Sequence, residues 1–194
     1  EFYCKWHEED VQWQTDTAKR YVDDSHITEQ DRVIVSMLSK RRLLDIIRFY
    51  ILYDSGIKKV ARYQQFFGVE NTMRRIHGED DCLSRGGVIW HTQGSGKSLT
   101  MVMLVKRIIA DKRVANPRFV LVDESHRSHT GEFHNMMNEV LPNAFKVGFT
   151  GTPLLRKDKS NTYLKFGKQI GHSYRFEDGI RDGVIVPLVY DGRV

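Results

Sequence analysis

A glycine-bearing segment, Gly94-Ser95-Gly96-Lys97-Ser98, lies between two apolar runs. Glycines let backbone amides approach phosphate oxygens, and a helix that begins directly behind them adds the positive end of its dipole. Lys97 can reach the β- and γ-phosphates as a point charge, and the Ser98 hydroxyl can bind Mg²⁺. All five residues are therefore predicted to bind a nucleotide. The usual pattern begins with Gly or Ala where this chain has His91, but the Gly-x-Gly-Lys-Ser centre is intact.

An acidic pair, Asp123-Glu124, ends the apolar run "RFVLV". An acidic residue at the end of a buried strand beside a phosphate loop is placed to hold Mg²⁺, and a following Glu can orient and deprotonate the attacking water. We assign Asp123 to Mg²⁺ and Glu124 to water. The alternative is that the two carboxylates merely open a loop. The nearby histidines 126, 129 and 134 match no common zinc-ligand spacing, so the predicted metal is Mg²⁺ bound with the nucleotide.

The turn Thr150-Gly151-Thr152 follows a third apolar run, "FKVGF". Its two hydroxyls, on Thr150 and Thr152, could sense the γ-phosphate and pass its state to neighbouring loops. By itself the segment would be only a turn. It gains meaning because it follows the phosphate loop and the acidic pair in this order.

The elements that position these residues alternate between strand and helix. Strands are predicted at 87–91, 118–124 and 145–150, and helices at 99–112 and 132–140. The second of these strands is predicted to be buried and to pair in parallel with its neighbours. Alternation of this kind predicts an α/β fold with a parallel sheet flanked by helices and right-handed crossovers. The apolar side of the helix at 99–112 is predicted to comprise Met101, Leu104, Val105, Ile108 and Ile109.

The residues before the sheet read as mostly helical. Residues 32–53 predict one amphipathic helix, and a second helical segment covers residues 58–78. Residues 1–31 show no clear period and carry nine acidic against three basic side chains, whereas residues 32–194 carry a net charge of +11. We interpret residues 1–31 as an acidic arm or the tail of a preceding domain. The basic remainder suits a polyanion such as nucleic acid, although a solvated basic surface is an alternative.

Composition excludes several classes of protein. Hydrophobic residues make up 40% and charged residues 28% of the chain, which is globular composition. No window approaches 18 consecutive apolar residues and the amino terminus is acidic, so we expect a cytoplasmic protein without a membrane partner. Cys4 and Cys82 are far apart and outside any Cys-x-x-Cys spacing, which indicates two reduced thiols.

The three segments together resemble motifs I, II and III of superfamily 2 helicases and DNA translocases. The phrases "ARYQQFFGV", "WHTQGSGKSLTM", "VDESHRSHTGEF" and "GFTGTPL" resemble the motor part of the restriction (R, or HsdR) subunit of type I restriction-modification enzymes. The resemblance implies a RecA-like P-loop NTPase lobe with an amino-terminal helical segment. It divides the chain into an arm (1–31), a helical segment with a Q motif (32–85), the first RecA-like lobe (86–183) and the start of a link to a second lobe (184–194).

The same resemblance assigns further roles. Gln65 in "RYQQ" matches the glutamine that recognises adenine, with Gln64 as the alternative, and so implies ATP as the nucleotide. His126 is implied to couple hydrolysis to the DNA-contacting loops. The implied partners are double-stranded DNA and the modification (methyltransferase) and specificity subunits of the restriction complex.

Two departures from the family limit the prediction. Lys97 and Asp123 are 26 positions apart, where superfamily 2 motors place several strands and DNA-contacting motifs, so an internal segment is expected to be missing. The second lobe with its arginine finger and the nuclease domain are also not found, and such a finger is worth about 10³ to 10⁵ in rate. The chain is therefore expected to bind ATP better than it hydrolyses it.

We interpret the sequence as the ATP-binding and ATP-hydrolysing motor lobe of a type I restriction enzyme R subunit, which drives translocation of double-stranded DNA before cleavage by a nuclease domain elsewhere. The alternatives are another superfamily 2 helicase or translocase, and a truncated ATP-binding module without turnover. A small-molecule P-loop kinase fits less well, because it has no use for the Thr-Gly-Thr turn.

Overall fold

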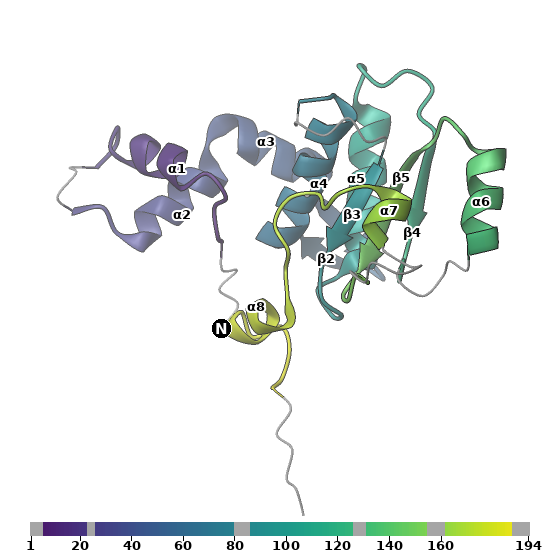
Figure 1. The fold of residues 1–194 in the computed structure, drawn as a ribbon. Helices are drawn as coiled ribbons and strands as arrows, with labels where there is room; N and C mark the ends of the chain where they lie inside the picture. Colours follow the sequence, from purple (N-terminus) through teal and green to yellow (C-terminus); the bar gives the residue numbers. More distant parts are fainter. Residues whose placement is uncertain (1–5, 23–25, 80–85, 126–130, 155–161, 188–194) are drawn as a thin grey trace, which may run out of the picture. The chain divides into compact units, whose positions relative to one another are not determined.

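The computed structural model describes residues 6–22, 26–79, 86–125, 131–154 and 162–187. The chain forms two compact units, residues 1–67 and 68–194, and the boundary falls inside helix α4 (Tyr63–Ile76). The division of the chain at residues 31, 85 and 183 that the sequence suggests stays a prediction. Figure 1 traces the elements along the chain.

The first unit contains three helices and a hairpin. Helix α1 (Val11–Ala18) begins at Asp10, whose side chain accepts a hydrogen bond from the Trp13 N–H, and α2 (Glu29–Leu38) begins with a capping box between Thr28 and Asp31. Helix α3 (Lys40–Phe49) leads into strands β1 (Ile51–Asp54) and β2 (Ile57–Val60), which pair antiparallel. Both residues of the hairpin turn, Ser55 and Gly56, have positive φ, as a tight two-residue turn requires.

The core of the first unit is an aromatic cluster around a cation. The buried Trp6 ring lies 5.3 Å from the ring of Phe66 and 5.6 Å from that of Phe67. The Arg42 guanidinium lies 4.7 Å from the Trp13 ring centre and forms an ion pair with Glu8. Guanidinium groups stack well on aromatic faces because the ring quadrupole attracts the cation. Trp6 and Glu8, which belong to the acidic segment that showed no periodicity, are therefore packed into this core.

The second unit is built on a three-stranded parallel sheet of order β3-β5-β4. Its strands are β3 (Gly86–Trp90), β4 (Phe119–Val122) and β5 (Phe145–Thr150), and its helices are α5 (Lys97–Ala110), α6 (Gly131–Val140), α7 (Thr162–Phe166) and α8 (Phe176–Arg181). Helix α7 packs over β3 and β5 (Figure 1). On that face Val88 packs with Met137 and Phe166. The predicted α/β class with a parallel sheet flanked by helices is confirmed.

The outer side of β3 is covered by the segment from residue 168 to residue 174. The Ile170 N–H donates to the Val88 carbonyl (2.8 Å), and the Tyr174 N–H donates to the Trp90 carbonyl (2.8 Å). The buried Arg75 side chain donates to the carbonyls of Lys168 and Gln169. These bonds satisfy the peptide groups on that side of β3.

Several local predictions were wrong. The single helix predicted at 32–53 is interrupted at Ser39, whose ψ of 132° is not helical, and its last residues form β1. The helical segment predicted from residue 58 begins with β2, and α4 starts only at Tyr63. Residues 184–187, the described part of the predicted link, contain no strand. Among the described helices, none has the length and apolarity that spanning a membrane requires.

Burial along α5 and β4 also differs from the prediction. Leu104 and Ile108 of α5 are buried as predicted, but Val105 and Ile109 are exposed. Every residue of β4 is only half-buried, although the sequence predicted a buried strand. The reason is its position, because β4 is the outermost strand of the described sheet.

Candidate nucleotide site

The phosphate loop connects β3 to α5 at the carboxyl end of the sheet. Gly94 and Gly96 have φ values of 80° and 86°, a left-handed backbone that L side chains rarely adopt. Gly96 is the N-cap of α5 and provides no capping side chain. The first turn of this 14-residue helix therefore offers its N–H groups and the positive end of its dipole to an anion.

The polar side chains of the loop divide into two groups. The Ser95 hydroxyl is buried and donates to the Thr92 carbonyl (2.6 Å), so it closes the turn. Lys97 is also buried, and its Nζ lies 3.5 Å from Glu124 Oε1. Ser98 is exposed. A buried ammonium and an exposed hydroxyl in the first turn of the helix match what a nucleotide phosphate and its cation need.

The acidic pair lies directly after β4, in the same unit as the loop. Asp123 is exposed, and its Oδ1 accepts a hydrogen bond from the Glu124 N–H (2.9 Å). Glu124 has a φ of +47°, which is uncommon for a residue with a side chain and is often found at functional sites. This conformation places the Glu124 carboxylate beside Lys97. The structure thus brings together the predicted phosphate-binding lysine and the predicted general base.

Ser125 fixes the acidic pair to the neighbouring strand. Its N–H donates to the Phe149 carbonyl (3.0 Å), and its buried hydroxyl has no hydrogen-bond partner among the described residues. A Cβ at Gly148 would lie 2.8 Å from the Ser125 hydroxyl oxygen. A small residue at 125 and a glycine at 148 are therefore required together.

The Thr150-Gly151-Thr152 turn lies against the phosphate loop. The His91 N–H donates to the Thr150 carbonyl (2.9 Å), and a Cβ at Gly151 would lie 3.2 Å from the Gln93 nitrogen. Thr150 is buried, and its hydroxyl accepts a hydrogen bond from the Thr152 N–H (3.1 Å). Backbone contact between turn and loop means that neither can move far without the other.

His91 is a buried side chain at the start of the loop. Its ring makes an edge contact with Tyr174 at 6.1 Å, and its Nδ1 has no hydrogen-bond partner among the described residues. Burial, and to a smaller extent the positive charge of Lys97, together lower the pKa of His91 to about 4. The imidazole is therefore neutral at physiological pH and serves as a packing element behind the loop.

The resemblance also implied roles for Gln65 and His126, which lie outside the segments described above. Gln65 belongs to the first unit and is buried, and its Oε1 accepts a hydrogen bond from the Arg62 N–H (2.9 Å). Gln64 is also buried, and neither of its amide atoms has a partner among the described residues. The adenine role of Gln65 stays a prediction. His126 lies outside the described residues.

Sequence reasoning missed the residues that support the loop from the side. The Trp90 indole N–H donates to the Gly151 carbonyl (3.0 Å), and the Arg175 guanidinium stacks on the Trp90 ring at 4.6 Å. The Thr92 N–H donates to the Tyr174 carbonyl (2.7 Å). The tryptophan directly before the phosphate loop could have indicated a supporting side chain. No local sequence pattern indicated the pairing with residues near 174.

The family model described as SWI2/SNF2 ATPase matches residues 64–120 and 114–194. The type I restriction enzyme HindI endonuclease subunit of Haemophilus influenzae is 26% identical over 272 aligned residues, covering 90% of this chain and 25% of that protein. The type I restriction enzyme SsaAORF53P endonuclease subunit of Staphylococcus saprophyticus is 35% identical over 75 residues, covering 37% of this chain and 8% of that protein.

A solved fragment of a protein described as an HsdR subunit of a type I restriction enzyme, from Vibrio vulnificus YJ016, is 18% identical with a TM-score of 0.47. It covers 79% of this chain, which in turn covers 36% of it. This chain spans a quarter or less of the length of the two curated relatives described above. The family match covers more than half of the chain and includes all three site segments. The chain therefore belongs to the SWI2/SNF2 ATPase family.

Proposed function

We propose that the chain is the ATP-binding and ATP-hydrolysing motor lobe of a type I restriction enzyme R subunit. The observation that carries the proposal is the convergence, within one unit, of a glycine-bearing loop, a buried Lys97 and the Glu124 carboxylate at 3.5 Å. The relatives that are described as type I restriction enzyme subunits support this assignment over another kind of superfamily 2 motor.

The residues present fit a nucleotide with Mg²⁺. The left-handed Gly94 has no atom within 4 Å of where a Cβ would lie, so the loop leaves open space on that side. The loop amides and Lys97 would hold phosphate oxygens, while the Ser98 hydroxyl and the Asp123 carboxylate are the oxygen ligands that Mg²⁺ prefers. Gln65 is assigned to the adenine edge by resemblance, with one donor and one acceptor on its amide.

The proposed mechanism assigns each side chain a task. Bound Mg²⁺–ATP supplies the γ-phosphoryl group that water attacks. The Glu124 carboxylate orients that water and accepts its proton, and Lys97 stabilises negative charge on the phosphoryl oxygens. Thr150 and Thr152 belong to a turn in contact with the loop, so their position follows the state of the γ-phosphate. In the intact subunit, His126 would pass that state to loops that contact DNA.

The wider role belongs to the whole subunit. We propose that it translocates double-stranded DNA together with the modification and specificity subunits, and that cleavage is carried out by a nuclease domain elsewhere. The net charge of +11 on residues 32–194 suits a polyanionic substrate. The second candidate is an ATP-binding module without turnover, which the short spacing between Lys97 and Asp123 favours.

Binding and turnover of ATP by the purified chain separate these candidates. We expect calorimetry to show Mg²⁺-dependent binding of ATP, and Lys97→Ala to weaken it about 10-fold or more through loss of the charged contact. Lys112→Ala, an exposed lysine past the end of α5, is the matched control. Hydrolysis stimulated by duplex DNA would support the motor, and binding without hydrolysis would support the module. Absence of ATP binding would refute both.

A further inference from the structure

Trp90 is a side chain that joins β3 to the Thr150-Gly151-Thr152 turn. It is the last residue of β3 and pairs in register with Thr150 at the end of β5. Its indole N–H reaches past that pair and donates to the Gly151 carbonyl (3.0 Å). Because the ring is only half-buried, water could serve the indole N–H, so burial does not force this bond. The bond fixes a turn whose position follows the γ-phosphate in the proposed mechanism.

The peptide between Gly151 and Thr152 is held at both of its polar groups. Trp90 binds its carbonyl, and the buried Thr150 hydroxyl accepts a hydrogen bond from its N–H, which belongs to Thr152 (3.1 Å). A peptide is planar, so fixing both groups fixes the orientation of the whole unit. The position of the exposed Thr152 side chain, which follows this peptide directly, therefore depends on Trp90.

Arg175 holds the Trp90 ring in place. Its guanidinium lies 4.6 Å from the ring centre, and its Nε donates to the Ser173 hydroxyl (3.2 Å). A cation over an indole face is attracted by the ring quadrupole. The intervening residue bonds to the same strand, because the Tyr174 N–H donates to the Trp90 carbonyl (2.8 Å). Residues 173–175 thus hold both the side chain and the backbone of Trp90.

The phosphate loop itself is held by bonds that do not involve the indole. The Thr92 N–H donates to the Tyr174 carbonyl (2.7 Å), and the Ser95 hydroxyl donates to the Thr92 carbonyl (2.6 Å). Loss of the indole N–H would therefore release only the peptide that follows Gly151 and would leave the loop amides in place. Contacts with phosphates that ATP and ADP share should persist, while contacts with the γ-phosphate should weaken.

We propose that Trp90 is a positioning residue that gives the site its preference for a nucleoside triphosphate over a diphosphate, and that Arg175 keeps its ring in the required orientation. The indole N–H orients the Gly151–Thr152 peptide, and this peptide directs the Thr152 side chain toward the γ-phosphate. The loop amides bind phosphates that both nucleotides have, so they do not discriminate. This inference rests on the proposed nucleotide site and names how that site distinguishes ATP from ADP.

Trp90→Phe tests the proposal because it keeps an aromatic ring beside Arg175 and removes the indole N–H. In calorimetry its affinity for a non-hydrolysable Mg²⁺–ATP analogue should fall about fivefold, as expected for one lost hydrogen bond, while its affinity for Mg²⁺–ADP should stay within about twofold of the parent value. Arg175→Gln should act in the same direction by a smaller factor, because Trp90 keeps its N–H and loses only the cation over its ring.

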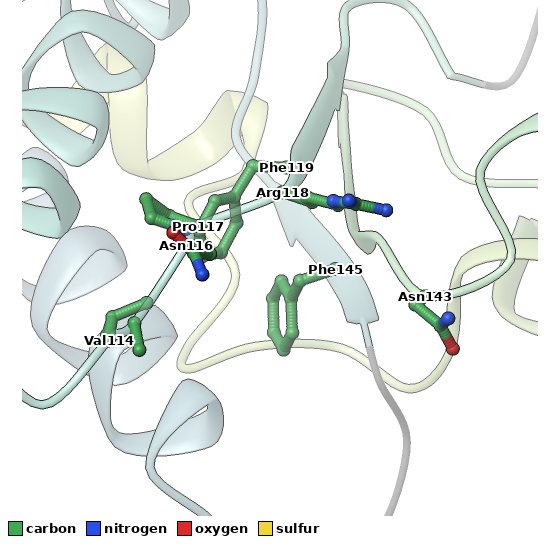
Figure 2. Close-up of a pocket in the computed structure, with 8 residues that line it drawn as sticks. Val114, Asn116, Pro117, Arg118, Phe119, Asn143 and Phe145 are labelled. Carbon is green, nitrogen blue, oxygen red and sulfur yellow. The ribbon is translucent and has the colours of Figure 1, made fainter.

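Arg118→Gln is the matched control for Arg175→Gln. Arg118 is exposed and directly precedes β4, at the opposite end of the sheet from the phosphate loop. Figure 2 shows its side chain pointing away from the rings of Phe119 and Phe145, which line a hollow of about 390 Å³ there. The control variant should bind both nucleotides as the parent does.

Fluorine NMR follows Trp90 itself. The chain has three tryptophans, so labelling with 5-fluorotryptophan gives three ¹⁹F signals, and Trp90→Phe identifies the one that belongs to Trp90. The ATP analogue should shift this signal, and ADP should shift it far less, because only the analogue has a γ-phosphate to contact the turn.

Three results would overturn the proposal. Equal weakening of analogue and ADP binding in Trp90→Phe would mean that Trp90 supports the whole site, and unchanged binding of both would mean that its bond has no role in binding. Equal ¹⁹F shifts with the two nucleotides would show that the ring responds to occupancy of the loop and not to the γ-phosphate. A parent chain that binds neither nucleotide would instead refute the proposed nucleotide site, and this inference with it.

Discussion

His91 stands where phosphate loops usually have Gly or Ala, and its burial has a consequence for stability. The pKa of His91 is lowered to about 4 by burial and by Lys97, whereas an exposed histidine titrates near 6.5. As the pH falls from 6.5 toward 4, the His91 imidazole binds a proton in the unfolded chain but stays neutral in the folded chain. Folding is therefore stabilised above pH 6.5, and this contribution is lost progressively below it.

We expect the free energy of unfolding to drop by about 2 kcal/mol between pH 7 and pH 5 because of this residue. Urea titrations of the parent and of His91→Ala at both values measure it. The alanine variant removes the group, so its loss over the same interval should be smaller by that amount. Parallel losses in the two proteins would show that His91 titrates normally in the folded state.

Glu124 is the second residue whose contacts make a prediction. Its carboxylate lies 3.5 Å from Lys97 Nζ and its backbone is left-handed, so it pairs with the cation that we propose binds the γ-phosphate. Glu124→Gln removes both the proposed general base and the competing charge. We expect hydrolysis to fall about 10²-fold or more, while affinity for a non-hydrolysable ATP analogue rises a few-fold.

Turnover assays and calorimetry check the two parts of this expectation separately. Glu177→Gln changes an exposed carboxylate in the first turn of α8 and should alter neither quantity. Lower affinity in Glu124→Gln would mean that the carboxylate helps to hold the nucleotide and does not compete with it.

At the scale of elements, the contact between the Thr150-Gly151-Thr152 turn and the phosphate loop is the most consequential. A Cβ at Gly151 would approach the Gln93 nitrogen at 3.2 Å, the Thr92 Cα at 3.4 Å and the His91 carbonyl oxygen at 3.5 Å. These are backbone atoms or lie on the backbone, so the loop itself must shift by a few tenths of an ångström to admit a methyl group. A loop displaced in this way presents its amides less accurately.

Gly151→Ala should therefore weaken ATP binding several-fold and lower stability by about 1 kcal/mol, because overpacking is destabilising. Gly183→Ala is a useful comparison, since Gly183 has a positive φ and open space around it. That variant should lose stability through backbone strain and keep its affinity for ATP. If Gly151→Ala lowers stability but leaves the affinity for ATP unchanged, the turn does not influence nucleotide binding.

At the scale of the molecule, the sequence predicted well what depends on neighbouring residues. Gly94, Gly96 and Lys97 form the loop between strand and helix, and the parallel strands around it were placed correctly because each is a short apolar run between turn residues. The break at Ser39 was missed because both flanking helices continue the same apolar period. The exposure of Val105 could not be read from α5 itself, since burial depends on what lies opposite.

Long-range pairing was the other failure. The bonds of Ile170 and Tyr174 to β3 join segments some eighty residues apart, and no local periodicity encodes such a partner. The half-burial of β4 could not be predicted for the same reason. A run such as "FVLV" has the composition of a central strand, and whether a neighbour lies beside it depends on segments elsewhere in the chain.

The two edges of the sheet are unlike, and this difference limits how the protein can self-associate. Residues 168–174 close the side of β3 with main-chain bonds, while β4 remains open among the described strands. A sheet that can accept a strand on one side only can join one further sheet and no more. Copies that met through β4 would stop at a pair, because among the described residues this sheet offers no second free edge for the next copy, and growth into filaments by addition to this sheet is blocked.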